Sequence, residues 1–268
     1  LKVHEIPQMG PAAKGKAIIN LLNLEKEEKV ATTVTVRDFP EDRYLIFATE
    51  RGTIKKTELS AYANPRSGGI IAINIEEGDR LLAVRVTDGT KDILLATARG
   101  FSVRFSESDA RPMGRATYGV RGITLRQDDR VVSMEVLEPG GEVMTVAERG
   151  YGKRTALDEY RRQGRGGLGI INLKVTPKTG EVIGVKQVTA DDGMMLITHE
   201  GKIIRLNVSG VRVIGRSTQG VKLMDLEAED RLVAAAKLAE RDEEEETPEG
   251  EGAPPAAPAG GEPEGTIH

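Results

Sequence analysis

The sequence predicts an all-β protein in which short blades, each a small sheet of about four strands, are arranged around a common axis. The first observation is a phrase that ends in a turn glycine and occurs four times. Its closing residues Gly52, Gly100, Gly150 and Gly201 are 48, 50 and 51 residues apart. The second observation is a phrase of strand period between these turns. Repeats of about 40 to 50 residues with several strands each are typical of blades around an axis.

The strand-period phrase begins with a glycine and has apolar residues four and six positions later. It occurs at 69–75, 119–125, 169–175 and 220–226, and a further copy stands at 15–21. Apolar positions with a period of two indicate a half-buried strand. An acidic turn residue follows in three repeats, at the positions Asp79, Asp129 and Asp230. Because these residues recur with the repeat, we interpret them as turn formers rather than a catalytic acid and base.

The units follow one another in a fixed order along the chain. A partial unit at 1–40 precedes repeats at about 41–88, 89–138, 139–189 and 190–239, so four complete blades and part of another are expected. Residues 234–240 are good helix formers, but their place in the repeat predicts its closing strand. The tail 240–268 contains ten acidic residues and one basic residue and is rich in Pro, Gly and Ala. We expect this tail to be disordered.

The composition argues against several classes of protein. No apolar run approaches the ~20 residues that a membrane span requires, and the first residues show no signal-peptide pattern. The chain has no cysteine, which excludes disulfides and thiolate metal sites and fits the cytoplasm. The three histidines His4, His199 and His268 have no second ligand at metal-site spacing. We therefore expect no catalytic residue, metal or cofactor in this segment and no membrane association.

The charge is distributed unevenly. The whole chain has a net charge of −4, of which the tail contributes −9, so residues 1–239 have about +5. A basic residue stands four positions after each turn glycine, at Lys56, Arg104, Arg154 and Arg205. A residue type that returns at one position of a repeat returns at one place in space, so these four predict a ring of cations. Solubility requires charge, but it does not require the same sign at the same position of every repeat.

A second basic position lies in the phrase G-R-x-x-x-G, at Arg115, Arg165 and Arg216, with Arg66 and Lys14 as looser equivalents. Repeated positive charge around a rim fits a long polyanion, because phosphates bind Lys and Arg without regard to base sequence. Aromatic residues make up only 3% of the chain, which favours duplex DNA over single strands. The candidate DNA-binding residues are Lys14, Lys16, Lys55, Lys56, Arg66, Arg104, Arg115, Lys153, Arg154, Arg161, Arg162, Arg165, Lys202, Arg205 and Arg216.

This hypothesis makes two demands. If about eight cations meet phosphates, the logarithmic salt slope of binding is about −7, at ~0.9 per contact. The four ring cations must also lie exposed on equivalent faces. If they lie on unrelated faces or are buried in carboxylate pairs, the hypothesis in this form fails.

One glycine-rich loop combines flexibility with positive charge. It consists of Gln163, Gly164, Arg165, Gly166, Gly167, Leu168 and Gly169 and directly follows Arg161 and Arg162. Glycine allows positive φ and lets a phosphate approach backbone N–H groups, while the arginines supply charge. An ordinary glycine turn between strands is the alternative. A nucleotide-binding P-loop is disfavoured, because no G-K-(S/T) closes the motif and a strand follows it.

Several stretches resemble the C-terminal domain of the DNA gyrase A protein: LKVHEIP at 1–7, AIINLL at 17–22, GYGKRTA at 150–156 and GRSTQGV at 215–221. The resemblance covers residues 1 to about 239. It implies a six-bladed β-pinwheel whose rim binds, bends and wraps duplex DNA to support negative supercoiling. It also implies a cytoplasmic, nucleoid-associated type II topoisomerase. The implied partners are the N-terminal breakage-reunion part of the gyrase A protein and the gyrase B protein, in an A2B2 heterotetramer, with ATP and Mg²⁺ on those other parts.

The hallmark of that family is the gyrase A box, Q-R-R-G-G-(R/K)-G, which by register is expected upstream of this chain. The loop at 163–169 has five of its seven residues, with Gly164 and Leu168 in place of basic ones. Two alternatives stay open: the homologous domain of the topoisomerase IV C protein, and a protein-binding propeller whose basic rim meets an acidic partner. Glycan-binding or enzymatic propellers are weaker alternatives. We also expect the acidic tail to compete with DNA for the rim, because like charge repels phosphate.

Overall fold

The computed structural model of the chain describes residues 1–10, 12–22, 24, 28–66, 68–227 and 229–238. The tail predicted to be disordered, 240–268, lies outside the described residues. Within the described residues, the regular secondary structure consists of β-strands and short 3-10 helices. None of these helices has the length and apolar character that a membrane crossing requires. The predicted all-β class is therefore confirmed.

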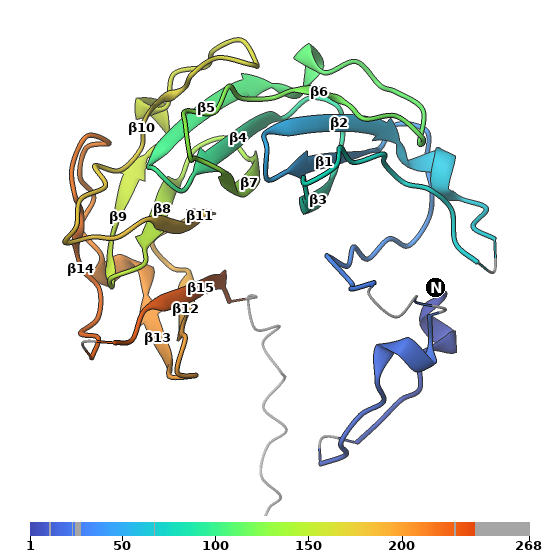
Figure 1. The fold of residues 1–268 in the computed structure, drawn as a ribbon, viewed down its shortest axis with the longest axis horizontal. Helices are drawn as coiled ribbons and strands as arrows, with labels where there is room; N and C mark the ends of the chain where they lie inside the picture. The colour runs from blue at the N-terminus through green and yellow to red at the C-terminus, as the bar shows by residue number, and fades with distance from the viewer. Residues whose placement is uncertain (11, 23, 25–27, 67, 228, 239–268) are drawn as a thin grey trace, which may run out of the picture. The chain divides into compact units, whose positions relative to one another are not determined.

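Four antiparallel sheets follow one another along an arc within Leu1–Leu238 (Figure 1). From the inner to the outer side of the arc, the first sheet contains β3 (Leu81–Thr87), β1 (Tyr44–Thr49), β2 (Thr53–Glu58) and β6 (Val120–Arg121). The second contains β7 (Val131–Leu137), β4 (Asp92–Thr97), β5 (Phe101–Ser106) and β10 (Ile170–Ile171). The third contains β11 (Val182–Val188), β8 (Glu142–Ala147), β9 (Tyr151–Ala156) and β14 (Val221–Lys222).

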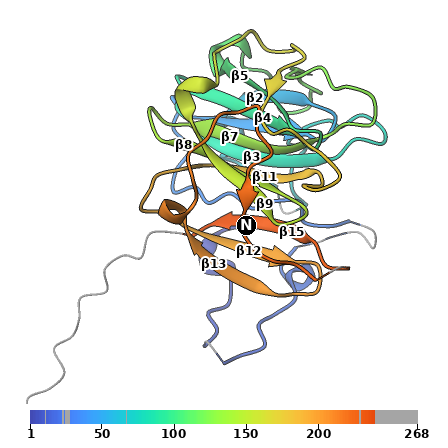
Figure 2. The ribbon, with the colours of Figure 1, turned by 90° about the vertical axis from the view of Figure 1, so that its left-hand side faces the viewer.

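The fourth sheet has three strands among the described residues: β15 (Leu232–Lys237), β12 (Gly193–Thr198) and β13 (Ile203–Asn207). These three strands lie side by side in Figure 2. The inner strands β3, β7, β11 and β15 contact one another in that order, so neighbouring sheets meet along them. The strand predicted for the helix-forming stretch after residue 234 is confirmed by β15.

The outer strand of each four-stranded sheet comes from the following repeat. β6 lies between β5 and β7 in the chain, yet it pairs with β2, with Val120 opposite Ile54. In the same way β10 pairs with β5, and β14 pairs with β9. Each repeat therefore contributes three strands to its own sheet and one short strand to the sheet before it.

Two predicted strands are wrong. Residues 15–21 contain the 3-10 helix η2 (Ile18–Asn20), and residues 69–75 contain no strand. The equivalent strands β6, β10 and β14 each pair with the hairpin of the preceding repeat, and the described part of residues 1–40 contains no such hairpin. Without a partner these segments cannot form a ladder, and Ile19 and Ile71 remain exposed.

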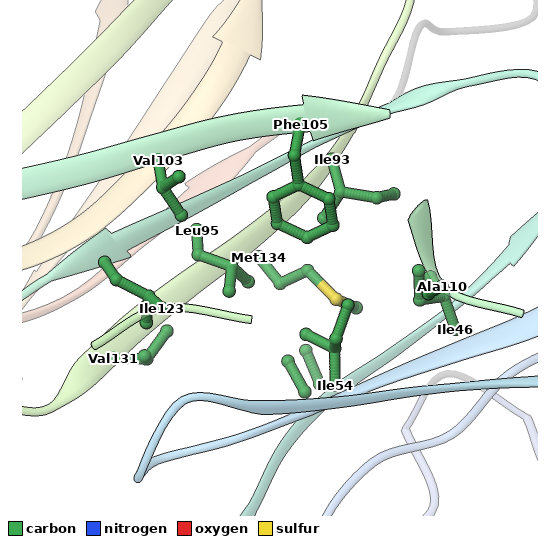
Figure 3. Packing of buried hydrophobic residues seen from close by; sticks show 12 residues of the cluster. Ile46, Ile54, Ile93, Leu95, Val103, Phe105, Ala110, Ile123, Val131 and Met134 are labelled. Atoms are coloured by element: carbon green, nitrogen blue, oxygen red, sulfur yellow. The ribbon is translucent and has the colours of Figure 1, made fainter. Parts of the chain in front are cut away.

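One apolar cluster fills each boundary between neighbouring sheets. Figure 3 shows the first, in which Ile54 of the first sheet packs with Phe105 of the second. In the three copies that form a strand, the fourth residue of the strand-period phrase enters these clusters: Ile123, Leu173 and Met224 are all buried. Since this residue belongs to the repeat that supplies the outer strand, burial fixes how that strand is placed.

The acidic turn residues close the hairpin turns. Asp79 Oδ1 accepts hydrogen bonds from the N–H groups of Arg51 (2.9 Å) and Arg80 (2.7 Å). Asp129 and Asp230 accept the equivalent bonds in their own repeats. The interpretation of these residues as turn formers is therefore confirmed.

Five 3-10 helices besides η2 complete the described secondary structure. They are η1 (Val3–Glu5), η3 (Leu59–Tyr62), η4 (Glu107–Asp109), η5 (Leu157–Glu159) and η6 (Val208–Gly210). The last four each follow the second strand of a hairpin directly.

Candidate nucleic-acid interface

Three connecting segments, which we call straps, cover the outer edges of the first three sheets. They are residues 110–121, 160–171 and 211–222. Each strap begins directly after a 3-10 helix, forms one parallel bridge to the preceding hairpin and ends in the outer strand of that sheet. In Figure 1 the three outer strands β6, β10 and β14 lie on the outer side of the arc. The straps therefore bring equivalent positions of successive repeats to one side of the arc.

Each strap contains three cations and no carboxylate. The cations are Arg111, Arg115 and Arg121 in the first, Arg161, Arg162 and Arg165 in the second, and Arg212, Arg216 and Lys222 in the third. Together they contribute +9, whereas residues 1–239 as a whole have +5, so the remainder of that region has −4. The net positive charge of residues 1–239 is thus concentrated in three short segments at the sheet edges.

The predicted ring of Lys56, Arg104, Arg154 and Arg205 is wrong as an exposed surface. Lys56 is buried, and its Nζ lies 3.2 Å from the buried carboxylate of Glu107. Arg154 is also buried, with Nη1 2.7 Å from Glu142. Arg104 is half-buried, with Nε 2.8 Å from the carboxylate of Asp92. Of the four, Arg205 alone is exposed.

Lys56, Arg104 and Arg154 contact the 3-10 helix of the next repeat. Arg104 Nη1 donates to the carbonyl oxygens of Leu157 (3.3 Å) and Tyr160 (3.1 Å), at the two ends of η5. Arg154 donates from Nε to Val211 O (2.7 Å) and from Nη2 to Ser209 O (3.3 Å). The same sign recurs at this position because the same packing contact recurs. Arg205, on β13, has no following strap among the described residues, which explains its exposure.

Two predicted DNA-binding lysines, Lys55 and Lys153, are fully buried beneath the strap loops. Lys55 Nζ donates to Ala72 O (2.6 Å) and to Arg115 O. Burial, together with the nearby Arg115 guanidinium, lowers the pKa of Lys55 to about 8. In the second sheet the equivalent position holds Val103, so that sheet has no lysine there.

Lys153 is the corresponding buried lysine beneath the third strap. Its Nζ donates to Gly215 O (2.8 Å), to Arg216 O and to Thr218 Oγ1 (3.3 Å). Burial lowers the pKa of Lys153 to about 7; the carboxylate of Glu159 opposes this shift and the Arg216 guanidinium adds to it. Neither Lys55 nor Lys153 is accessible to a ligand.

The glycine-rich loop at 163–169 lies against the preceding strap. Arg165 donates from Nε to Asp109 O (2.9 Å) and from Nη1 to Arg121 O (3.0 Å). Gly169 has φ +71°, and a Cβ added there would stand 2.5 Å from Ser102 O on β5. Gly169 is thus required by the close approach of the outer strand to β5. For this glycine the structure supports the alternative of an ordinary structural turn.

The other predicted DNA-binding residues are mostly exposed. Lys14, Lys16 and Arg66 are exposed but lie outside the straps. Lys202 is exposed and pairs with Glu227 at 2.5 Å. The remaining strap residues of the predicted set divide into exposed Arg161 and Arg162, of which Arg162 pairs with Asp92, and half-buried Arg115 and Arg216.

Sequence reasoning missed four of the nine strap cations, which are Arg111, Arg121, Arg212 and Lys222. Arg111 and Arg212 are exposed, and within the described ranges neither side chain has a hydrogen bond or an ion pair. The available signal was their offset: together with Arg161 they stand three residues before Gly114, Gly164 and Gly215. In the same ranges, no three His, Cys, Asp or Glu side chains gather in a way that would hold a metal ion.

Antiparallel blades placed side by side, with inner strands in contact and outer edges covered by the next repeat, define a propeller-like repeat domain. A family model described as DNA gyrase C-terminal domain, beta-propeller, matches residues 1–37, 43–88, 91–138, 141–189 and 194–239. The chain belongs to this family, and the resemblance found in the sequence is confirmed.

Relatives at the sequence level are DNA gyrase A proteins. That of Halalkalibacterium halodurans is 52% identical over 91% of this chain and 29% of its own length. That of Clostridium acetobutylicum is 45% identical over 91% of this chain and 30% of its own length. This chain therefore spans about 30% of the length of these relatives.

Two solved structures have the same fold. A C-terminal domain of DNA topoisomerase IV superposes with a TM-score of 0.82 at 27% identity, covering 88% of this chain and 74% of that one. A DNA gyrase A C-terminal domain superposes with a TM-score of 0.76 at 26% identity, covering 85% of this chain and 76% of that one.

Proposed function

We propose that this chain is the DNA-binding part of a DNA gyrase A protein and that duplex DNA lies across its three straps. The observation that carries the proposal is the concentration of nine cations, without a carboxylate, in three segments at equivalent sheet edges. Lys and Arg bind phosphates by charge and by counterion release, so this surface holds DNA without reading its sequence.

The arrangement of the straps also favours a bent duplex. Because the three outer strands follow an arc, DNA that meets all three straps has to curve around the outer side (Figure 1). Bending a duplex of about 20 to 30 base pairs by 40 to 90° costs on the order of 1 to 6 kcal/mol. Several phosphate contacts offset such a cost, as arginines do on the histone octamer.

In this proposal the segment wraps DNA and performs no catalysis itself. The wrap supports negative supercoiling by a cytoplasmic type II topoisomerase. DNA cleavage takes place in the breakage-reunion part of the gyrase A protein, and ATP and Mg²⁺ act on other parts, ATP on the gyrase B protein. The similarity to a topoisomerase IV domain favours a second candidate, the corresponding DNA-binding domain of that enzyme. Both candidates bind duplex DNA, and supercoiling activity of the complete enzyme distinguishes them.

The test is the affinity of the chain for duplexes of about 40 and 140 base pairs over a series of salt concentrations. The expected result is tighter binding to the longer duplex and a steep fall with salt. At ~0.9 per contact, nine cations set an upper limit of about −8 for the logarithmic slope. Weak binding that does not depend on salt would contradict DNA binding and favour a protein-binding propeller.

A further inference from the structure

One position of the straps holds an arginine in all three repeats: Arg111, Arg161 and Arg212. The backbone at this position is fixed on both sides. The residue before it is the C-cap of the 3-10 helix and is buried in every strap. The residue after it forms the parallel bridge to Lys56, Arg104 or Arg154. The buried cations described above therefore hold this arginine in place at the surface of each sheet.

The three side chains are free to meet a ligand. All are exposed, and none has a hydrogen bond or an ion pair within the described ranges. Among the residues that the structure describes, no other strap position has an exposed, unpaired cation in all three repeats. Arg121 is exposed and unpaired within the described ranges, but Ile171 and Lys222 stand at its position, and Arg115 is half-buried. Arg165 and Arg216 donate to backbone carbonyls, and Lys222 pairs with Asp225 at 2.5 Å.

We propose that Arg111, Arg161 and Arg212 are the repeating phosphate contacts of the straps, one on each of three successive sheets. This inference rests on the DNA binding proposed above. It assigns different roles to the repeated cations: Lys56, Arg104 and Arg154 hold the straps, and the free arginines bind the DNA backbone. A guanidinium with all its donors unused binds a phosphate with charge-assisted, bidentate hydrogen bonds.

The chain offers a matched set of control residues. Arg80, Arg130 and Arg231 also recur at one position of the repeat and are exposed. They follow the acidic turn residues, at the hairpin turns. Arg130 pairs with Glu181 at 3.0 Å, and Arg231 lies 3.8 Å from Glu148. Carboxylates neutralise much of the charge of Arg130 and Arg231. Arg80 has no ion pair within the described ranges, so it controls for an exposed, unpaired arginine that lies at a turn and outside the straps.

The experiment compares two triple variants with the unchanged chain on a 140-base-pair duplex over a salt series. Arg111→Gln/Arg161→Gln/Arg212→Gln removes the proposed contacts, and Arg80→Gln/Arg130→Gln/Arg231→Gln removes the same charge elsewhere. The strap triple is expected to make the logarithmic slope about 2.7 less steep, at ~0.9 per contact. If affinities converge at 1 M salt, this equals a loss of about 500-fold at 0.1 M. The control triple is expected to retain the original slope.

A third variant, Arg111→Lys/Arg161→Lys/Arg212→Lys, retains the charge and is expected to retain most of the slope, which separates loss of contact from misfolding. Equal losses in the two glutamine triples would overturn the assignment, because charge alone would then explain them. An unchanged slope in the strap triple would also overturn it while leaving DNA binding intact. Failure of the unchanged chain to bind DNA would overturn both proposals.

Discussion

Removing the guanidinium of Arg154 tests whether the repeated cations of the hairpins belong to the fold. Arg154→Met retains most of the aliphatic volume and deletes the charge. In the structure this side chain pairs with Glu142 at 2.7 Å and donates to the carbonyl oxygens of Val211 and Ser209. All three partners are held at the junction between the third sheet and its strap, so the variant leaves them without their donor.

The size of the effect follows from burial. Breaking a buried ion pair costs about 3 to 5 kcal/mol, and an acceptor left without a donor costs about 1 to 3 kcal/mol more when it stays dry. Glu142 is partly exposed, so water replaces part of the lost contact. We therefore expect Arg154→Met to lower the free energy of unfolding by about 3 to 4 kcal/mol. That is a large fraction of the roughly 5 to 15 kcal/mol typical of folded domains.

The assay is equilibrium unfolding in urea, with Arg205→Met as the matched control. Arg205 occupies the same position in the fourth sheet but is exposed, and within the described ranges it has no ion pair. Its replacement is expected to change the free energy of unfolding by less than about 0.5 kcal/mol. Equal effects of the two substitutions, or a loss below about 1 kcal/mol for Arg154→Met, would refute the structural role. A shallower DNA salt slope in a fully stable Arg154→Met protein would instead make this residue a phosphate contact.

Two further predictions concern the turns and the buried lysine. Gly100→Ala places a Cβ 2.2 Å from Leu173 O at φ +80° and is expected to cost more than about 2 kcal/mol in urea unfolding, whereas Gly164→Ala meets nothing within 4 Å and is expected to be nearly neutral. Similar costs at both sites would contradict the close approach. Lys153 has its pKa lowered from 10.5 to about 7, so between these values the unfolded chain binds more protons and stability rises with pH, by up to about 1.4 kcal/mol per unit. Lys153→Met is expected to lack this component in urea unfolding at pH 7 to 10, and identical pH dependence in both proteins would rule the shift out.

Periodicity within one repeat predicted the fold correctly in three of the five strand phrases, whereas the copies at 15–21 and 69–75 form no strand. Ile123, Leu173 and Met224 were expected to be buried because they follow a glycine by four positions in a strand phrase, and they fill the boundaries between sheets. Asp79 was expected in a turn because it recurs with the repeat, and it accepts two backbone hydrogen bonds there. These features depend on contacts that recur in each repeat, so the same residue types recur at the same position in the sequence.

Contacts between repeats could not be predicted from the sequence period. The pairing of Val120 with Ile54 involves a two-residue strand, too short to show which hairpin it joins. The repetition of Lys56 and Arg154 resembled a ligand-binding surface, because a contact between consecutive repeats recurs as regularly as an exposed face does. Lys56 and Arg154 are buried and paired with carboxylates, whereas Arg111 and Arg161 are exposed and, in the described part of the chain, unpaired. The spacing of residues in the sequence does not reveal this difference.

The borrowed outer strand gives the array a direction. Each four-stranded sheet is completed by the repeat after it, so losing one repeat uncovers the edge of its predecessor and leaves its successor's sheet complete. Among the described residues no outer strand pairs with β13 of the fourth sheet, and Ile203 and Ile204 are exposed there. Because the outer edge of each sheet depends on the repeat after it, unfolding that begins at the fourth sheet exposes the edge of the third sheet and continues in this order toward the N-terminus.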